Sequence, residues 1–154
     1  MLRRAFYLLP FACCLAADPA RETADVIREL AASLTAGNAQ EFLRHFDRAM
    51  PGYDKLSANV TALVRQGETQ SYVDVVSNEG DGETRTLTVT WELRLQREGE
   101  ATASARPEAK VTCKLRKQGK QWRIVSFAPL DFLSASWQAG RPVRSTTPRT
   151  NALC

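Results

Sequence analysis

Within residues 85–96, apolar and polar side chains alternate along the chain. This period of two predicts a β-strand with one apolar and one polar face, long enough to cross a small domain. The apolar row contains no acid, base or hydroxyl group and consists of Leu87, Val89, Trp91, Leu93 and Leu95. A cavity lined by this row would offer a ligand apolar contact and no reactive group, so the longest strand argues against an enzyme.

The N-terminus has the layout of a secretory signal peptide. A short basic start, residues 1–4, precedes an uncharged and mostly apolar run over residues 5–17, and Asp18 follows. The small residues Ala16 and Ala17 predict cleavage near Ala17 and export to a periplasm or to the outside of the cell. The run is shorter than the ~20 apolar residues that span a bilayer, so we expect no transmembrane anchor.

Positive charge is concentrated at the two ends of the chain, whose formal net charge is +4. Residues 1–17 contribute Arg3 and Arg4, and residues 134–154 contribute three arginines and no acid. The part between these ends is close to neutral, whereas nucleic-acid binding requires a clustered basic patch. We therefore expect no nucleic-acid partner, and we expect residues 134–154 to form a basic, disordered tail.

Two of the four cysteines lie in the predicted leader, and Cys113 and Cys154 remain after cleavage. An exported protein can hold a disulfide, but Cys113 falls on the apolar side of a predicted strand, where a free cysteine packs as a small hydrophobic residue. We favour two unpaired thiols; a bridge between them, and lipid attachment at Cys13 or Cys14, are the alternatives. With one histidine in the chain, the spacing predicts no metal site, and we expect no cofactor.

Three stretches have the spacing of amphipathic helices. The first covers residues 21–36. The second begins at Asn38, which would cap it with Glu41 as capping-box partner, and runs to Met50 before a Pro-Gly break. The third covers residues 53–65. The side chains predicted to face inward are Val26, Ile27, Leu30 and Leu34, then Phe42, Leu43, Phe46, Ala49 and Met50, then Leu56, Val60, Leu63 and Val64.

After Gly67 the period changes to two, which predicts four strands. They cover residues 70–77, 85–97, 108–117 and 121–130, with a turn at 78–82 and a polar connection at 99–107. In the last strand the expected inward row is Trp122, Ile124 and Ser126, and Leu133 and Trp137 are expected to dock beyond its end. Helices followed by strands predict an α+β domain over residues 18–133, in which three N-terminal helices pack on a four-stranded antiparallel meander.

This order resembles the nuclear transport factor 2-like fold, in which a curved antiparallel sheet wraps around helices and leaves a cone-shaped pocket. The resemblance is carried by the helix start at residues 39–46, the break at 50–53, the strand with Trp91, and residues 120–125, where Trp122 opens the last strand as a tryptophan commonly does in such domains. With the leader, it points to an exported bacterial member. The fold hosts ketosteroid isomerases, scytalone dehydratases, polyketide cyclases and transport factors, so it implies no single reaction.

An isomerase or cyclase of this fold needs an acid or a base inside the cone. The catalytic hypothesis is His45 as a pocket base, with Asp47, Tyr53 or Asp74 near it. We favour the reading without a catalytic residue, in which His45 lies at a helix edge, Tyr53 packs, and Asp74 faces solvent. The predicted lining of the cone is Phe42, Phe46, Leu87, Val89, Trp91, Leu93, Val111, Cys113, Trp122 and Ile124.

These patterns favour a non-catalytic exported domain that binds a small apolar ligand in the cone or docks a protein partner. One alternative is a small cofactor-free lyase or isomerase. Another is a homodimer whose cone is filled by its own side chains, with Trp91 and Trp122 as core residues. An interior cavity below about 300 Å³ would favour the filled cone, because ligand pockets are usually larger.

Overall fold

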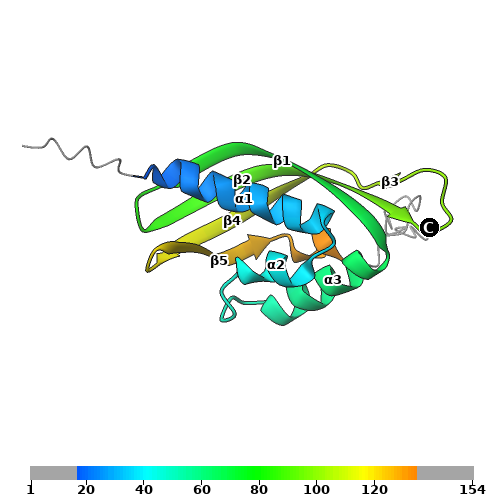
Figure 1. Cartoon of the computed structure of the whole chain (residues 1–154). Helices are drawn as coiled ribbons and strands as arrows, with labels where there is room; N and C mark the ends of the chain where they lie inside the picture. The colour runs from blue at the N-terminus through cyan, green and yellow to red at the C-terminus, as the bar shows by residue number, and fades with distance from the viewer. Residues whose placement is uncertain (1–16, 135–154) are drawn as a thin grey trace, which may run out of the picture.

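The computed structural model describes residues 17–134 as one antiparallel sheet with three helices packed against it (Figure 1). The helices are α1 (Pro19–Thr35), α2 (Ala39–Arg44) and α3 (Tyr53–Arg65), and all three precede the strands. The predicted α+β order is therefore confirmed. The predicted leader (residues 1–17) lies outside the described residues except for its last residue. The predicted tail (residues 134–154), including Trp137, lies outside them except for its first.

The N-cap residue fixes where the first helix begins. The side chain of Asp18 accepts a hydrogen bond from the backbone N–H of Ala20 at 3.0 Å, and Pro19 fits the first helical position because no N–H is needed there. The helix predicted at residues 21–36 is confirmed, with its start moved to this cap. Its fully buried stripe contains Ile27, Leu30 and Leu34.

The second helix is shorter than predicted, because α2 ends at Arg44 instead of running to Met50. The N–H of Ile124 donates to the carbonyl of His45 at 2.9 Å, and the N–H of Asp47 donates to the carbonyl of Ile124 at 2.9 Å. This bridge pulls residues 45–47 out of the helix and against the last strand. Phe46 and Met50 are still buried, as predicted, whereas Ala49 is exposed.

The third helix has the predicted bounds, and its start depends on a glycine. Gly52 has a φ of +80°, and a Cβ there would lie 2.4 Å from Cδ1 of Leu130. Glycine is the residue that adopts this left-handed conformation without steric cost. The buried face of α3 contains Leu56, Val60 and Leu63.

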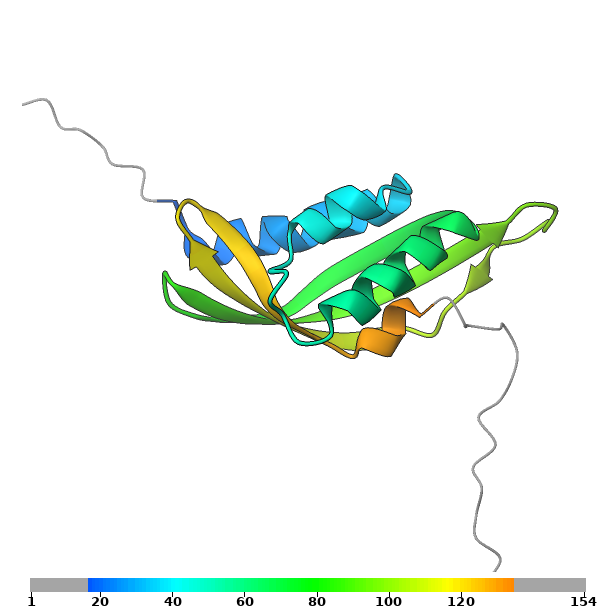
Figure 2. The same ribbon diagram turned by 90° about the horizontal axis from the view of Figure 1, so that it is seen from below.

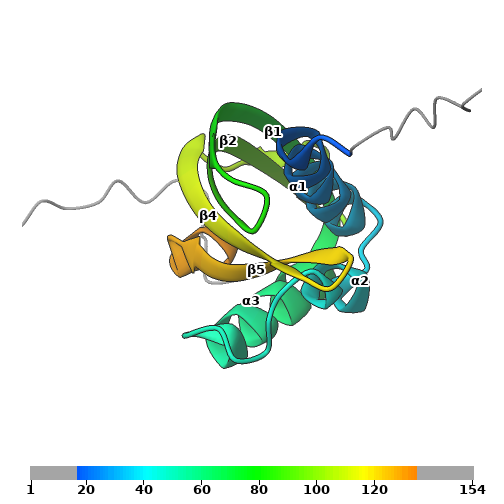
Figure 3. The same ribbon diagram turned by 90° about the vertical axis from the view of Figure 1, so that its left-hand side faces the viewer.

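The sheet has the order β1-β2-β4-β5, with the short β3 paired to β2. Its strands are β1 (Gly67–Gly80), β2 (Thr84–Arg97), β3 (Ser104–Ala105), β4 (Ala109–Gln118) and β5 (Gln121–Ala128). The four predicted strands are present, and β3 lies in the stretch predicted as a polar connection. The predicted turn at residues 78–82 is too long, because β1 continues to Gly80. Figure 3 shows the sheet curling from α1 round to α3.

The inward row of β5 differs from the prediction in its second half. The pairing with β4 shifts at Val125, because Lys114 faces Ser126 while the next residue, Leu115, faces Ile124. Such a bulge adds one residue and reverses the alternation beyond it. Ser126, predicted inward, is therefore exposed, and Phe127 is buried.

The interior between helices and sheet is filled by aromatic side chains. The ring of Trp91 lies 6.0 Å from that of Phe127 and 5.9 Å from that of Phe132, and Phe46 lies 5.7 Å from Phe127. The indole N–H of Trp91 donates to Oγ of Ser71 at 2.7 Å. The short 3₁₀ segment η1 (Leu130–Leu133) carries Phe132 and the buried Leu133, so the predicted docking of Leu133 is confirmed.

An interior cavity among the described residues is small. Its volume is about 10 Å³, and it lies between Leu63, Thr69, Leu93, Leu95 and Arg106. A ligand pocket usually exceeds ~300 Å³, and a space of this size holds at most about one water molecule. The cone is therefore packed like a protein core. Figure 2 shows η1 lying beside α3.

Candidate functional site

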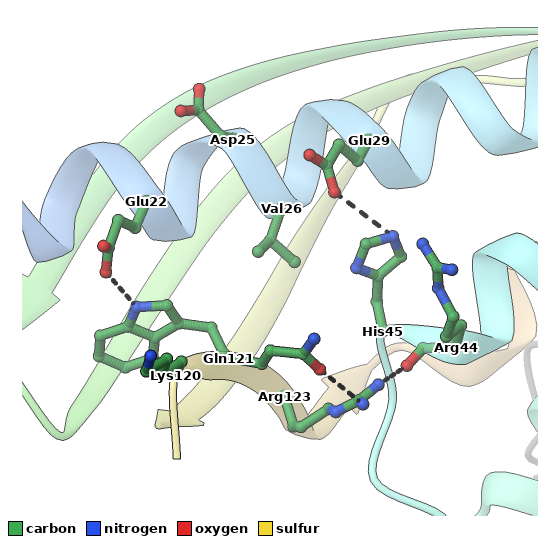
Figure 4. A pocket seen from close by; sticks show the side chains of 10 residues that line it. Glu22, Asp25, Val26, Glu29, Arg44, His45, Lys120, Gln121 and Arg123 are labelled. Carbon is green, nitrogen blue, oxygen red and sulfur yellow. Dashed lines mark hydrogen bonds and ion pairs between the residues drawn. The ribbon is translucent and has the colours of Figure 1, made fainter. Parts of the chain in front are cut away.

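The candidate functional site is a groove on the outside of the core, lined by charged and titratable side chains. It has a volume of about 530 Å³ and lies between α1, the end of α2 and the start of β5 (Figure 4). We call it the α1–β5 groove. One side carries the carboxylates of α1, and the other carries basic groups from α2 and the β4–β5 hairpin. These six residues are Glu22, Asp25, Glu29, Arg44, Lys120 and Arg123.

The helical period brings the acidic residues of α1 together. Glu22, Asp25 and Glu29 follow one another at spacings of three and four, which places them along one face of the helix. Val26 lies between them and lines the groove as well. The basic side is assembled differently, because the bridge between residues 45–47 and Ile124 brings the end of α2 against β5.

His45 lies deep in this groove, directly after the last residue of α2. Its side chain is 11% exposed, and its Nε2 lies 3.6 Å from Oε2 of Glu29. That separation is longer than a hydrogen bond, and Nε2 is buried without a hydrogen-bond partner among the described residues. Burial of a polar atom without a hydrogen-bond partner is unfavourable, because the atom gives up hydrogen bonds that it can form with water.

Burial lowers the pKa of His45 below its usual 6.5. The nearby carboxylates of Glu29 and Glu41 oppose this effect, and the guanidinium groups of Arg44 and Arg123 add to it. Desolvation is the largest contribution, since it penalises the charged imidazolium. At neutral pH the imidazole is therefore neutral and can accept a hydrogen bond.

The structure does not place the three hypothetical partners of His45 in its groove. Asp47 and Tyr53 line a second groove of about 650 Å³, beside α2 and α3. The carboxylate of Asp47 accepts hydrogen bonds from the N–H of Ala49 at 2.9 Å and from Gln118 at 2.8 Å, and these bonds lower its pKa. Asp74 is exposed on β1, opposite Thr90. The catalytic hypothesis with Asp47, Tyr53 or Asp74 beside His45 is therefore not supported.

The carboxylate beside His45 is that of Glu29, which sequence reasoning missed. Glu29 lies on α1 and His45 follows α2, so their meeting depends on how the two helices pack. The signal present in the sequence is the row of acids at helical spacing on α1, but such a row usually marks a solvated face. The contact between Glu29 and His45 can be recognised only when the position of α1 over the start of β5 is known.

Trp122 fixes the first turns of α1 to the β4–β5 hairpin. Its indole N–H donates to Oε2 of Glu22 at 2.7 Å. The ammonium of Lys117 lies 3.6 Å from the same oxygen and 5.6 Å above the indole ring. A hydrogen bond to a charged acceptor is stronger than one between neutral groups, so contacts within the protein hold this end of the groove in place.

Arg123 fixes the basic side. One guanidinium nitrogen donates to the carbonyl oxygen of Arg44, and the other donates to Oε1 of Gln121 at 2.9 Å. Arg44 forms a separate ion pair with Glu41. A guanidinium has five N–H donors in a fixed plane, so these two contacts set the orientation of Arg123 and leave it further donors.

The residues predicted to line the cone are all buried. Trp122 borders the α1–β5 groove, Phe46 the second groove, and Leu93 the small interior cavity. The others lie in the core: Phe42, Leu87, Val89, Trp91, Val111, Cys113 and Ile124. Cys113 is a free thiol, and burial raises its pKa to about 12, which makes it a poor nucleophile.

We searched the part of the chain that the structure describes for clusters of metal-ligand side chains and for helices that could span a membrane. In residues 17–134, no three His, Cys, Asp or Glu side chains gather in a way that could hold a metal ion. None of the helices α1, α2 and α3 is both long enough and apolar enough to cross a membrane.

The fold is that of known structures. No protein-family model and no curated protein sequence matches the chain. An NTF2-like protein with a cystatin-like fold from Novosphingobium aromaticivorans has a TM-score of 0.57 at 14% identity, covering 71% of this chain and 79% of that chain. An NTF2-like protein of unknown function from Shewanella oneidensis has a TM-score of 0.54 at 10% identity, covering 71% and 97%. The chain therefore has the nuclear transport factor 2-like fold, as the sequence predicted.

A third similar structure carries the name of an enzyme. A candidate scytalone dehydratase from Novosphingobium aromaticivorans has a TM-score of 0.59 at 9% identity and covers 70% of this chain and 79% of that chain. Identities at this level show the fold alone. Function has to be argued from the side chains of this chain.

Proposed function

We propose that this protein is an exported, non-catalytic binding domain that holds a small ligand, or a segment of a protein partner, in the α1–β5 groove. The observation that carries the proposal is the contrast between the interior cavity and the α1–β5 groove, where the buried His45 meets Glu29. The interior cavity is about 10 Å³, whereas the groove is about 530 Å³ and lies within the usual size of ligand sites. A site outside the core replaces the cone that the fold would lead one to expect.

The groove also has features of a binding site beyond its size. Its two sides carry opposite charge, its ends are fixed by Trp122 and Arg123, and the buried Nε2 of His45 lacks a hydrogen-bond partner among the described residues. A preformed site loses little freedom on binding. An apolar ligand in the cone is less well supported, because Trp91 and Phe127 would have to leave their packed positions to make room for it.

A native mass spectrum of the proposed mature chain, residues 18–154, purified gently, tests this proposal. We expect wild type to carry a ligand, Glu29→Lys to lose it, and Thr69→Val to keep it. Glu29 is exposed in the groove and Thr69 lines the interior cavity, so the pair separates the two spaces. Loss in Thr69→Val with retention in Glu29→Lys would place the ligand in the cone and contradict the proposal. The same spectrum shows whether the chain is a homodimer.

A wild type without a bound molecule would contradict the small-ligand form of the proposal. The protein-partner form is then tested by photocrosslinking from position 120, which lies in the groove, with position 74 on β1 as the control. Crosslinks from both positions alike would show that the groove is not the docking site.

A second candidate is a small cofactor-free enzyme, and the contact between His45 and Glu29 favours it. A neutral imidazole beside a carboxylate can act as a general base. In this reading the base works in the groove, with Glu29 in the role that the sequence suggested for Asp47, Tyr53 or Asp74. His45→Gln keeps a polar side chain of similar size, so a fold-preserving loss of turnover in a substrate screen would support the enzyme. Unchanged turnover would exclude His45 as the base.

Export is the part of the proposal that rests on sequence. Cleavage near Ala17 would leave Asp18, the cap of α1, at or next to the new N-terminus, so the mature domain keeps its first helix intact. Expression of the full chain in a bacterium, followed by fractionation and intact-mass measurement, tests it. A full-length mass in the cytoplasm would contradict export.

A further inference from the structure

We propose that the α1–β5 groove takes an α-amino acid zwitterion with an apolar side chain. Its ammonium would lie against Glu29 and His45, and its carboxylate against Arg123 and Lys120. This inference rests on the proposed function, because it names the ligand class of the same groove. It follows from which charged, polar and apolar groups line each side.

The acidic side fits an ammonium group. Glu29 offers a carboxylate that is 63% exposed, and the buried Nε2 of His45 lies 3.6 Å from it. An ammonium has three donors, so one group can bond to the carboxylate and to the imidazole nitrogen together. This would give Nε2 the partner that the described residues do not supply.

The basic side fits a carboxylate. Arg123 is held by the carbonyl of Arg44 and by Gln121, which fixes the plane of its guanidinium beside the groove. Lys120, on the β4–β5 hairpin, lines the same groove (Figure 4). Guanidinium and ammonium groups bind carboxylates through charge-assisted hydrogen bonds.

Two apolar side chains, Val26 and Trp122, stand among the charged and polar residues of the remaining lining and suit a hydrocarbon side chain. Val26 projects from α1 into the groove (Figure 4). The indole of Trp122 also lines the groove. Both side chains are held by the protein, because α1 packs on the sheet and the indole N–H is bonded to Glu22. A ligand carrying only one charge would leave one charged side of the groove without a partner.

The charges around His45 predict how binding depends on pH. Glu29 faces it from α1, Glu41 and Arg44 from α2, and Arg123 from β5. Protonation of the imidazole would remove the acceptor and place a cation beside the ammonium. Binding should therefore weaken as the pH falls through the pKa of His45.

The test is an NMR titration of ¹⁵N-labelled protein with L-leucine, N-acetyl-L-leucine and L-leucinamide. The second compound lacks the ammonium and the third lacks the carboxylate. We expect leucine to shift resonances of the groove, including the imidazole of His45, and each analogue to bind at least roughly tenfold more weakly, as loss of one charge-assisted hydrogen bond implies. Equal binding of all three compounds would overturn the proposal.

Two exposed variants assign the charges. Glu29→Gln should weaken leucine and leucinamide but not N-acetyl-leucine. Lys120→Gln should weaken leucine and N-acetyl-leucine but not leucinamide, by about threefold for a single exposed pair. Asp74→Asn on β1 is the matched control and should change none of the three. A pattern in which both groove variants affect all three compounds alike would contradict the assignment.

Failure of this inference can be told apart from failure of the proposed function. Leucine that causes no shifts at about 10 mM would have an affinity too weak to matter. If native mass spectrometry then finds another molecule that Glu29→Lys loses, the proposed ligand class is wrong and the groove remains the binding site. If that molecule is lost only in Thr69→Val, both are wrong.

Discussion

His45 shows how a single residue acquires its properties from elements far apart in the sequence. It is the only histidine in the chain, and its position beside an apolar stripe was readable from the sequence. What the sequence could not show is the carboxylate of Glu29 at 3.6 Å, because that contact depends on the packing of α1 against the end of α2. Reasoning by local spacing pointed instead to Asp47 and Tyr53, which line the second groove.

The lowered pKa of His45 gives a stability prediction with a definite sign. The unfolded chain takes up a proton near pH 6.5, and the folded protein takes it up at lower pH because burial penalises the imidazolium. The contribution of His45 to stability is therefore fully present above about pH 6.5. It declines as the pH falls toward the pKa of His45 in the folded protein. Urea unfolding of wild type at pH 7.5 and at pH 5.5 measures this change.

His45→Gln is the control for that measurement. Its free energy of unfolding should change less between these two pH values than that of wild type, because the contribution of the histidine is gone. The contribution of the carboxylates remains. NMR titration of the imidazole should give a midpoint below 6.5 in wild type. A midpoint above 6.5 would contradict this prediction, because it would mean that the charge of Glu29 outweighs burial.

At the scale of elements, strand β5 shows where alternation fails as a guide. The first half follows the sequence pattern, and Trp122 and Ile124 are buried as predicted. The bulge at Val125 then turns Ser126 outward and Phe127 inward. A bulge is set by the pairing between strands, and a single strand's sequence carries no clear mark of it. By contrast β2, which has no register shift against β4, keeps its predicted face from end to end.

The bulge gives opposite expectations for two neighbouring residues. Phe127→Ala removes a ring packed against Trp91 and Phe46 and should lower the free energy of unfolding by about 3–5 kcal/mol. Ser126→Ala changes an exposed side chain and should stay within about 0.5 kcal/mol of wild type. Chemical denaturation of both variants checks this. A larger loss for Ser126→Ala would mean that the simple alternation, without the bulge, describes β5.

Helix α2 shows that a row of buried residues can extend beyond the end of the helix that its spacing predicts. The spacing of Phe42, Phe46 and Met50 predicted a helix to residue 50, and all three are buried. The helix nevertheless ends at Arg44, because the backbone of residues 45–47 bonds to Ile124. Burial followed the pattern while the secondary structure did not, and the early end of α2 is what brings His45 to the groove.

At the scale of the whole molecule, the fold was predictable and the location of the site was not. The order of helices and strands, together with the apolar row of β2, was enough to predict an α+β domain of the nuclear transport factor 2-like type. The expectation of a ligand in the cone came with that resemblance. The structure fills this space with Trp91, Phe127 and Phe132, and it leaves a charged groove beside α1. Phe127 could not be assigned to the filling, because its inward orientation depends on the bulge.

The placement of the site in the groove depends most directly on the cone being closed, and a crystal structure under xenon pressure measures this. Xenon enters apolar cavities of about 150 Å³, whereas the interior cavity of this domain is about 10 Å³. We predict no xenon between the helices and the sheet. Xenon bound between Trp91 and Phe127 would show that the cone opens to apolar molecules, and it would contradict the placement of the binding site in the α1–β5 groove.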